Sequence, residues 1–388
     1  MIFSTALPGT YKLLSLLIFS HLNGMDSAGE FSNDLAMVFS TTLLLSNGWC
    51  AWLLSYLPKS SDIARRHNCF SKAFYGQVLF FIPGIVFLYF TYKINVISNF
   101  LFSTILLISF SIYQINRHYN LSLTFYRKQF IVELLIFTLM IFISCVAKNA
   151  NELLFYSSLV YFIVSLDVFF HLKTKIPSKN DFKFSIYSGF SNYLSGGILS
   201  LIIPVANFTG GSLVAGYCAL VTQFVSLSMY IPRNLSVYFM PRLSRVFEDK
   251  TKLLTIYSKF TTLNGLSLLI MSVLFLLFFT VDYILTMQYV KNYFLLQIAI
   301  LIVFTYLASQ LSLPSSNVLL SLEMPDVILK TNIIFSSGVL LLSIVLYVTH
   351  INRLIGNETF LILFLINLFV FQLIKLHLQS KRLKRQLQ

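Results

Sequence analysis

The sequence predicts an all-α polytopic membrane protein with twelve transmembrane helices in two six-helix lobes and with both termini in the cytoplasm. Three observations lead to this fold class. The composition is too apolar for a surface that faces water, and apolar segments of helical length recur along the whole chain. In addition, the basic residues fall mostly into alternate connecting segments.

The composition indicates that most of the surface faces lipid. Hydrophobic residues make up 57% of the 388 residues, charged residues make up 11%, and the mean hydropathy is +0.78. A soluble domain carries about 25% charged residues, so this chain has too few charges to cover a surface in water. A membrane β-barrel would instead show alternating segments of roughly ten residues.

Apolar segments of about 20 residues, the length that crosses a bilayer as a helix, recur along the chain. Helices are expected because every backbone polar group inside the bilayer needs a partner within its own segment. The first segment is the shortest. The predicted spans are 6–22, 31–57, 73–92, 95–115, 129–147, 153–172, 184–206, 212–239, 255–281, 293–313, 328–349 and 359–378.

The basic residues predict the orientation of these spans. Most of the 28 lysine and arginine residues lie in loops after even-numbered spans, in the flanks of those loops or near the C-terminus. Arg117 and Lys375 belong to this group. The exceptions are Lys12 inside the first span and, on the other side, Lys93, Lys148, Lys291 and Arg353. Because basic segments stay in the cytoplasm during insertion, we expect cytoplasmic termini, and the net charge of +14 favours orientation over nucleic-acid binding.

Several classes of chemistry lack their sequence signals. The four cysteines are scattered without CxxC spacing, which predicts neither a disulfide framework nor a metal site. No GxxxxGK[ST] phosphate loop is present, the connecting loops are short, and no catalytic constellation is visible. We therefore expect no cofactor, no soluble catalytic domain and no enzymatic activity. The cysteines are Cys50, Cys69, Cys145 and Cys218.

The spans divide into two sets of six. Residues 1–172 form the predicted N-terminal lobe, the basic segment 173–183 a cytoplasmic linker, and residues 184–388 the C-terminal lobe. Transporters often contain such internal repeats and bind their substrate between the repeats near the middle of the bilayer. The organisation therefore favours a transporter that works by alternating access.

Residues 210–249 resemble the region of helices seven and eight in polysaccharide transport proteins of the MOP (multidrug/oligosaccharidyl-lipid/polysaccharide) superfamily. The matching features are Gly216-Tyr217 at the start of the eighth helix and Pro241-Arg242-Leu243-Ser244 at its end. Residues 28–60 look like the second helix of that family, and residues 306–332 resemble its link from helix ten to helix eleven.

The most similar subgroup is Wzx, the O-antigen flippases of the bacterial inner membrane. The resemblance implies a lipopolysaccharide-related substrate, an oligosaccharide repeat unit on undecaprenyl pyrophosphate, moved from the cytoplasmic to the periplasmic leaflet. It also implies membrane lipids and other O-antigen assembly proteins as partners. The short first span departs from the family pattern.

Charged residues inside spans are costly and therefore mark functional candidates. Arg233 is predicted to contact the pyrophosphate, with snorkelling to the headgroups as the alternative. Lys12 and Lys259 are candidates for contacting the substrate, with snorkelling or a structural ion pair as the alternatives. Glu133 and Asp167 are predicted to act as gate or ion-coupling residues, paired with Lys12, Arg233 or Lys259, or to form static pairs.

Polar uncharged side chains in spans seven and eight are candidates for binding sugar hydroxyls, although such residues also link helices. These are Asn192, Asn207 and Gln223. Two other classes of function remain open from the residues. One is a multidrug cation exporter of the same superfamily. The other is a polytopic enzyme of O-antigen assembly, a polymerase or an acyltransferase.

Overall fold

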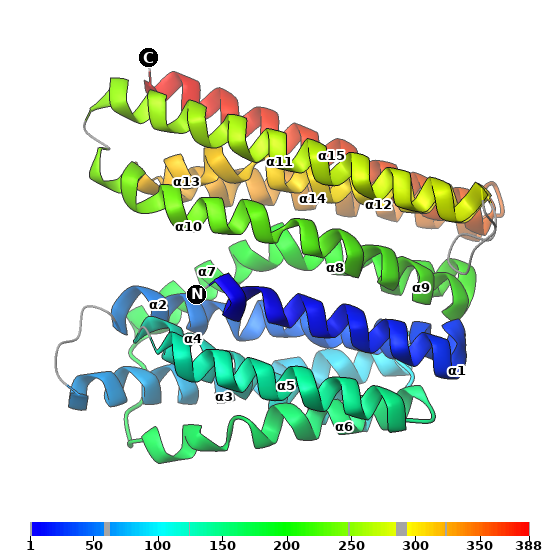
Figure 1. Cartoon of the computed structure of the whole chain (residues 1–388), viewed down its shortest axis with the longest axis horizontal. Coiled ribbons are helices and arrows are strands. Elements are labelled where there is room, and N and C mark those ends of the chain that lie inside the picture. Colours follow the sequence, from blue (N-terminus) through cyan, green and yellow to red (C-terminus); the bar gives the residue numbers. More distant parts are fainter. Residues whose placement is uncertain are drawn as a thin grey trace. The chain divides into compact units, whose positions relative to one another are not determined.

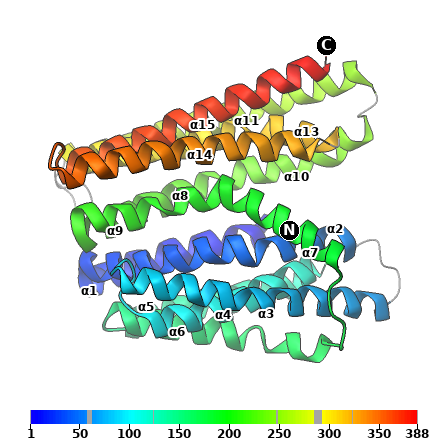
Figure 2. The same ribbon diagram turned by 180° about the vertical axis from the view of Figure 1, so that it is seen from behind.

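The chain folds almost entirely into helices in the computed structural model, which describes residues 2–57, 63–123, 125–246, 249–284, 293–322 and 324–387 (Figures 1 and 2). The helices are α1 (Ile2–Leu45), α2 (Asn47–Tyr56), α3 (Ile63–Lys93), α4 (Phe100–Ser122), α5 (Tyr126–Val146), α6 (Ala150–Ile163), the 3-10 helix η2 (Leu166–His171), α7 (Lys179–Asn192), the π-helix η3 (Tyr193–Gly197), α8 (Ile198–Ser200), α9 (Ile202–Ser228), α10 (Tyr230–Arg245), α11 (Lys250–Ile284), α12 (Tyr293–Leu311), α13 (Leu313–Ser321), α14 (Pro325–Ile351) and α15 (Asn357–Leu387).

The contacts divide the chain into two compact units, unit 1 (Met1–Ala219) and unit 2 (Leu220–Gln388). Unit 1 includes α7 because this helix packs closely on α2, where a Cβ on Gly48 would overlap the carbonyl oxygen of Ser185. The predicted six-helix lobes, 1–172 and 184–388 with the linker 173–183, stay a prediction.

Helix α1 is a helical hairpin. Its 44 residues would measure about 66 Å as one straight helix. Gly24 has φ 84° and ψ 161°, a conformation that L side chains rarely adopt. The ammonium of Lys12 lies 3.9 Å from the ring centroid of Phe39, and the rings of Phe19 and Phe31 are 6.2 Å apart. These contacts require the residues after Gly24 to run back along those before it (Figure 1).

Helix α9 contains a second glycine break of the same kind. Gly211 has φ 73° and ψ −174°, so the helical segment ending at Gly210 and the one beginning at Ser212 are separate. The predicted eighth span, 212–239, is not one helix either, because a turn at Met229 separates α9 from α10.

The two glycine breaks lie close together in unit 1. A Cβ on Gly29 would overlap the carbonyl oxygen of Ser212, and a Cβ on Gly216 would overlap the carbonyl oxygen of Met25. The hydroxyl of Ser212 donates a 2.8 Å hydrogen bond to Asp26. This backbone contact explains the glycine of the Gly216-Tyr217 motif, since any side chain there would push the two helices apart.

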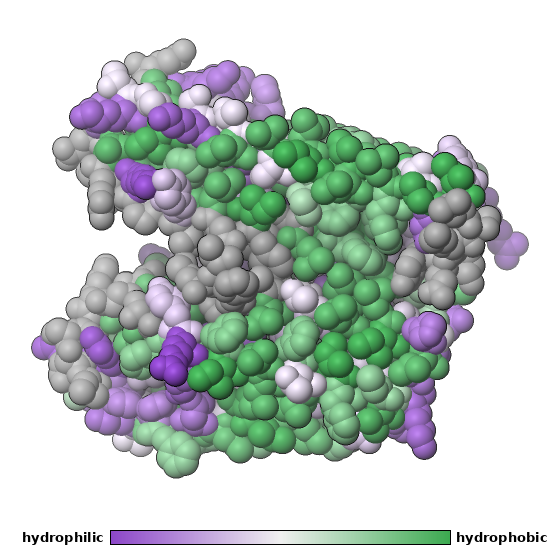
Figure 3. Space-filling view, in the orientation of Figure 1, coloured by the Kyte–Doolittle hydropathy of each residue, from purple (hydrophilic) through white to green (hydrophobic). Residues whose placement is uncertain are grey.

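The membrane-spanning character is confirmed. Among the described residues, nine helices are long and apolar enough to cross a bilayer, or ten if α1 and α2, bent by 47°, count as one span. Two of these ten contain the breaks at Gly24 and Gly211. Hydrophobic residues cover the middle of each unit and hydrophilic residues gather at its ends (Figure 3). The count of twelve spans and the cytoplasmic termini stay predictions.

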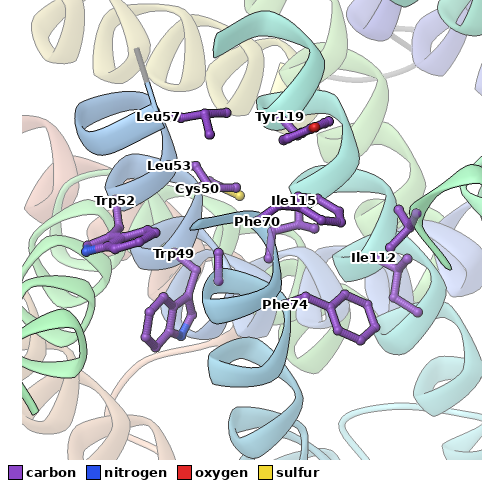
Figure 4. Packing of buried hydrophobic residues seen from close by; sticks show 12 residues of the cluster. Trp49, Cys50, Trp52, Leu53, Leu57, Phe70, Phe74, Ile112, Ile115 and Tyr119 are labelled. Carbon is purple, nitrogen blue, oxygen red and sulfur yellow. The ribbon is translucent and has the colours of Figure 1, made fainter. Parts of the chain in front are cut away.

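One hydrophobic cluster shows how the helices of unit 1 are held together. Leu53 of α2 and Leu57 just after it converge with Ile115 and Tyr119 of α4 around Phe70 of α3, all of them buried (Figure 4). Burying large apolar side chains stabilises a fold by roughly 1.5–3 kcal/mol each when they leave water. Between helices already in lipid, the gain comes instead from close packing.

Candidate functional site

The carboxylate of Glu133 is the centre of a buried polar cluster in unit 1. Its Oε1 accepts hydrogen bonds from the Tyr113 hydroxyl at 2.6 Å, from Arg117 Nε at 2.9 Å and from Gln129 Nε2 at 2.9 Å. Glu133 is fully buried, and its Oε2 has no hydrogen-bond partner within the described part of the chain. One oxygen is therefore saturated while the other stays available.

Helical spacing explains why these groups meet. Tyr113 and Arg117 are four residues apart on α4, and Gln129 and Glu133 are four residues apart on α5, so each pair shares one helix face. The short connection from Ser122 to Tyr126 makes α4 and α5 neighbours.

Tyrosines and a lysine extend this cluster toward α1 and α6. The hydroxyls of Tyr11 and Tyr161 are 3.2 Å apart, and the rings of Tyr113 and Tyr161 are 5.1 Å apart. Lys12 follows Tyr11 on α1, and its half-buried ammonium lies 3.9 Å from the Phe39 ring centroid and 5.5 Å from that of Phe110. The faces of aromatic rings attract cations, most strongly away from water.

Asp167 lies in η2, beyond the end of α6. It accepts a 2.6 Å hydrogen bond from Asn116 and forms an ion pair with Lys128 at 2.6 Å. The two side chains of the ion pair are 32% and 45% exposed, so water screens the attraction.

The described side chains give Glu133 and Asp167 cationic partners other than Lys12, Arg233 or Lys259, the partners considered from the sequence. Glu133 pairs with Arg117 and Asp167 with Lys128. Arg117 is within reach because α4 continues to Ser122, past the predicted span end at 115. Glu133 and Asp167 remain predicted gate or coupling residues.

The other predicted substrate contacts are spread over both units. Lys259 is exposed on α11, and Asn192, Asn207 and Gln223 are half-buried on α7 and α9. Arg233 lies in the helical backbone of α10, but its side chain lies outside what the structure describes, as does the whole of Lys291. Their roles stay predictions.

A second buried polar cluster, in unit 2, was not predicted. Lys375, assigned from the sequence to the cytoplasmic flank, is 6% exposed on α15 and lies 5.6 Å from the Phe335 ring centroid on α14. One turn on, fully buried Gln379 accepts from the Ser316 hydroxyl at 3.0 Å and donates to the Thr331 hydroxyl at 3.1 Å. Lys375 precedes a run of basic residues, which made it look like a headgroup anchor.

No family profile matches the chain, and no curated protein matches it. Solved structures do. An inward-facing multidrug resistance MATE family transporter of the MOP superfamily aligns with TM-score 0.75 and 14% identity, over 97% of this chain and 95% of that one. The eukaryotic MATE transporter AtDTX14 aligns with TM-score 0.67 and 12% identity, over 100% and 96%. An outward-facing multidrug resistance MATE family transporter aligns with TM-score 0.63 and 12% identity, over 99% and 94%.

The chain has the fold of MATE transporters. The predicted all-α polytopic membrane fold of the MOP type is thereby confirmed over nearly the whole length. Identities of 12–15% describe a shared fold, and a shared fold hosts different substrates. The cargo must therefore be argued from the residues of this chain.

Proposed function

We propose that the protein is a flippase that moves undecaprenyl-pyrophosphate-linked oligosaccharide repeat units from the cytoplasmic to the periplasmic leaflet of a bacterial inner membrane. The sugars and the pyrophosphate cannot cross hydrocarbon unaided. Alternating access of two six-helix lobes with cytoplasmic termini would shelter them, while the undecaprenyl chain stays in lipid. No covalent step is part of this proposal, and other assembly proteins would supply and consume the cargo.

The pairing of Glu133 and Asp167, the two carboxylates predicted inside spans five and six, is the observation that carries the proposal. Glu133 is neutralised by Arg117 and Asp167 by Lys128, so both carboxylates already have a cation of their own. A half-buried lysine ammonium, that of Lys12, lies among aromatic rings in the same unit. An exporter of cationic drugs would favour acidic residues facing its cargo, whereas this arrangement favours an anionic one.

A second candidate function is multidrug export. Its support is the fold, because structures described as multidrug resistance transporters align over nearly the whole chain. This candidate predicts efflux of organic cations, which is a separate measurement.

Reconstituted protein distinguishes the two candidates. A fluorescent undecaprenyl-pyrophosphate-linked oligosaccharide is placed in both leaflets of proteoliposomes, and dithionite bleaches the outer leaflet. We expect bleaching to continue beyond the outer-leaflet fraction as labelled lipid is flipped outward. Bleaching that stops at that fraction, together with ethidium export by the same preparation, would replace the flippase with a drug exporter.

Two variants locate the proposed headgroup contacts. Lys12→Gln and Arg233→Ala are each expected to slow flipping, because each removes a positive charge that would neutralise the pyrophosphate. Lys252→Gln is the matched control, since Lys252 forms an exposed ion pair with Asp249 three residues away. Flipping at the wild-type rate in both test variants, at equal protein content, would refute their assigned role.

A further inference from the structure

Lys375 lies in unit 2 on the face of α15 that packs on α14. Three contacts set an antiparallel register between these helices. Asn367 donates to the carbonyl of Val339, Lys375 lies against Phe335, and Gln379 donates to Thr331. The two helices also approach closely at Gly338 of α14, where a Cβ would overlap the Phe371 ring of α15.

The neighbourhood of Lys375 is polar but uncharged. Gln372, three residues earlier on the same helix face, is fully buried, and neither its amide nitrogen nor its amide oxygen has a partner within the described residues. An ammonium needs acceptors, and a neutral amine can also accept a hydrogen bond. The Gln372 amide, on the same helix face, has the chemistry to serve both forms, with its oxygen for the ammonium and its nitrogen for the neutral amine.

The helices packed against α15 provide little charge at this level. Helix α13 has no titratable residue, and α12 has Tyr293 and Tyr306. On α14 the charged residues are Asp326 and Lys330, an exposed ion pair nine and five residues before Phe335. Asp326 is thus about 14 Å along the helix from the amine's level. Further along α14 are Tyr347 and His350, and Glu323 lies outside the described residues.

Among the described residues, no counter-charge lies at the level of Lys375, and an unneutralised charge in a membrane-spanning helix is unfavourable. We propose that Lys375 is a proton-exchange site of unit 2, whose amine takes up one proton from water and returns it to water during the transport cycle. The N–H bond is the bond that forms and breaks, and no oxidant or reductant is involved. The claim that Lys375 couples protons to transport rests on the proposed function. The claim that Lys375 exchanges a proton with water does not depend on it.

Two substitutions fix the amine in opposite states. Lys375→Gln is permanently neutral and Lys375→Arg is permanently charged, because a guanidinium does not lose its proton in proteins. A structural cation would be rescued by arginine. If Lys375 is a proton site, neither the arginine nor the glutamine variant should keep the wild-type behaviour, because proton exchange needs both the charged and the neutral state.

Hydrogen exchange of purified protein in micelles tests the proton site without any substrate. Amide exchange in 325–351 and 357–387, normalised for its intrinsic pH dependence, is expected to be several-fold faster at pH 6 than at pH 8.5 in the wild type. Protonation places a charge between α14 and α15, and this charge promotes their opening. Lys375→Gln should exchange slowly at both pH values and Lys375→Arg rapidly at both. Lys381→Gln, on an exposed lysine of the same helix, should retain the wild-type pH dependence.

Two results would overturn the proposal. One is amide exchange that depends on pH in the same way in the wild type and in Lys375→Gln, or that depends on pH in neither protein. The other is a Lys375→Gln variant whose flipping of the fluorescent lipid still responds to an imposed pH gradient as the wild type does. If the exchange results hold but the wild type flips no labelled lipid, the proton site stands and the proposed function fails.

Discussion

The ion pair of Arg117 and Glu133 allows one prediction to be worked through from the structure. In Arg117→Met the hydrocarbon stem is kept but the guanidinium is lost. Glu133 is left fully buried, with Tyr113 and Gln129 as its remaining donors. Removing one partner of a buried pair costs about 3–5 kcal/mol, because the other charge is left uncompensated.

That cost should be visible in thermal unfolding. For a unit of about 200 residues, 1 kcal/mol corresponds to about 2–4 °C, so the melting temperature in detergent should fall by roughly 6–20 °C. Circular dichroism of purified protein measures the shift. Lys128→Met is the matched control, because its pair with Asp167 is 45% and 32% exposed and should contribute at most about 1 kcal/mol.

The double variant Arg117→Met with Glu133→Gln completes the test. Once both charges are gone, the glutamine amide needs no counter-charge and the tyrosine and glutamine donors keep an acceptor. The double variant should therefore be more stable than Arg117→Met alone, with a coupling energy of about 0.5–3 kcal/mol. If Arg117→Met lowers the melting temperature by less than Lys128→Met does, the importance assigned to the Arg117–Glu133 pair is refuted.

Three further predictions concern packing and helix ends. Gly216→Ala should lower the free energy of unfolding by about 1–3 kcal/mol, because its new methyl group would overlap the Met25 carbonyl. Gly265→Ala, with nothing within 4 Å of its added methyl group, should raise the free energy of unfolding by about 0.5–1 kcal/mol. Equal melting temperatures of the two variants would refute the close helix crossing at Gly216. Asp34→Ala should speed amide exchange at Ser98 and Asn99, whose backbone amides donate to that carboxylate, while α5 exchanges normally. Hydrogen bonds from Thr251 and the Lys252 amide hold the pKa of Asp249 below its usual value. The start of α11 should therefore lose protection in Asp249→Asn at pH 7, with the difference disappearing only as the pH falls below the usual carboxyl range.

The fold class could be predicted because hydropathy and the positive-inside rule depend on composition along the chain, which the sequence contains directly. Positions that depend on which face of a helix is buried could not be predicted in this way. Arg117 and Lys375 both lie near the ends of predicted spans, where a basic residue ordinarily reaches the headgroups. The structure directs both inward, Arg117 toward Glu133 and Lys375 toward Phe335.

The glycine reversals show a second limit. Gly24 lies in a segment predicted as a loop of eight residues between spans 6–22 and 31–57, yet the chain turns there at one residue and helix resumes at once. A single φ above zero leaves no trace in hydropathy, and glycine tolerates it at little steric cost. Glu133, by contrast, was recognisable because a carboxylate in an apolar span is rare.

Both tryptophans of the chain, Trp49 and Trp52 of α2, belong to the hydrophobic cluster around Phe70 in unit 1, at 0% and 2% exposure and with ring centroids 6.2 Å apart. Tryptophan emission of the native protein, excited at wavelengths that tyrosine does not absorb, therefore originates in unit 1 alone. Trp52 also stacks on Tyr56 at 4.9 Å. Any quenching or red shift of that tryptophan emission is then an optical signal from unit 1. A phenylalanine-to-tryptophan substitution in unit 2, made in a background without Trp49 and Trp52, would give that unit a signal of its own.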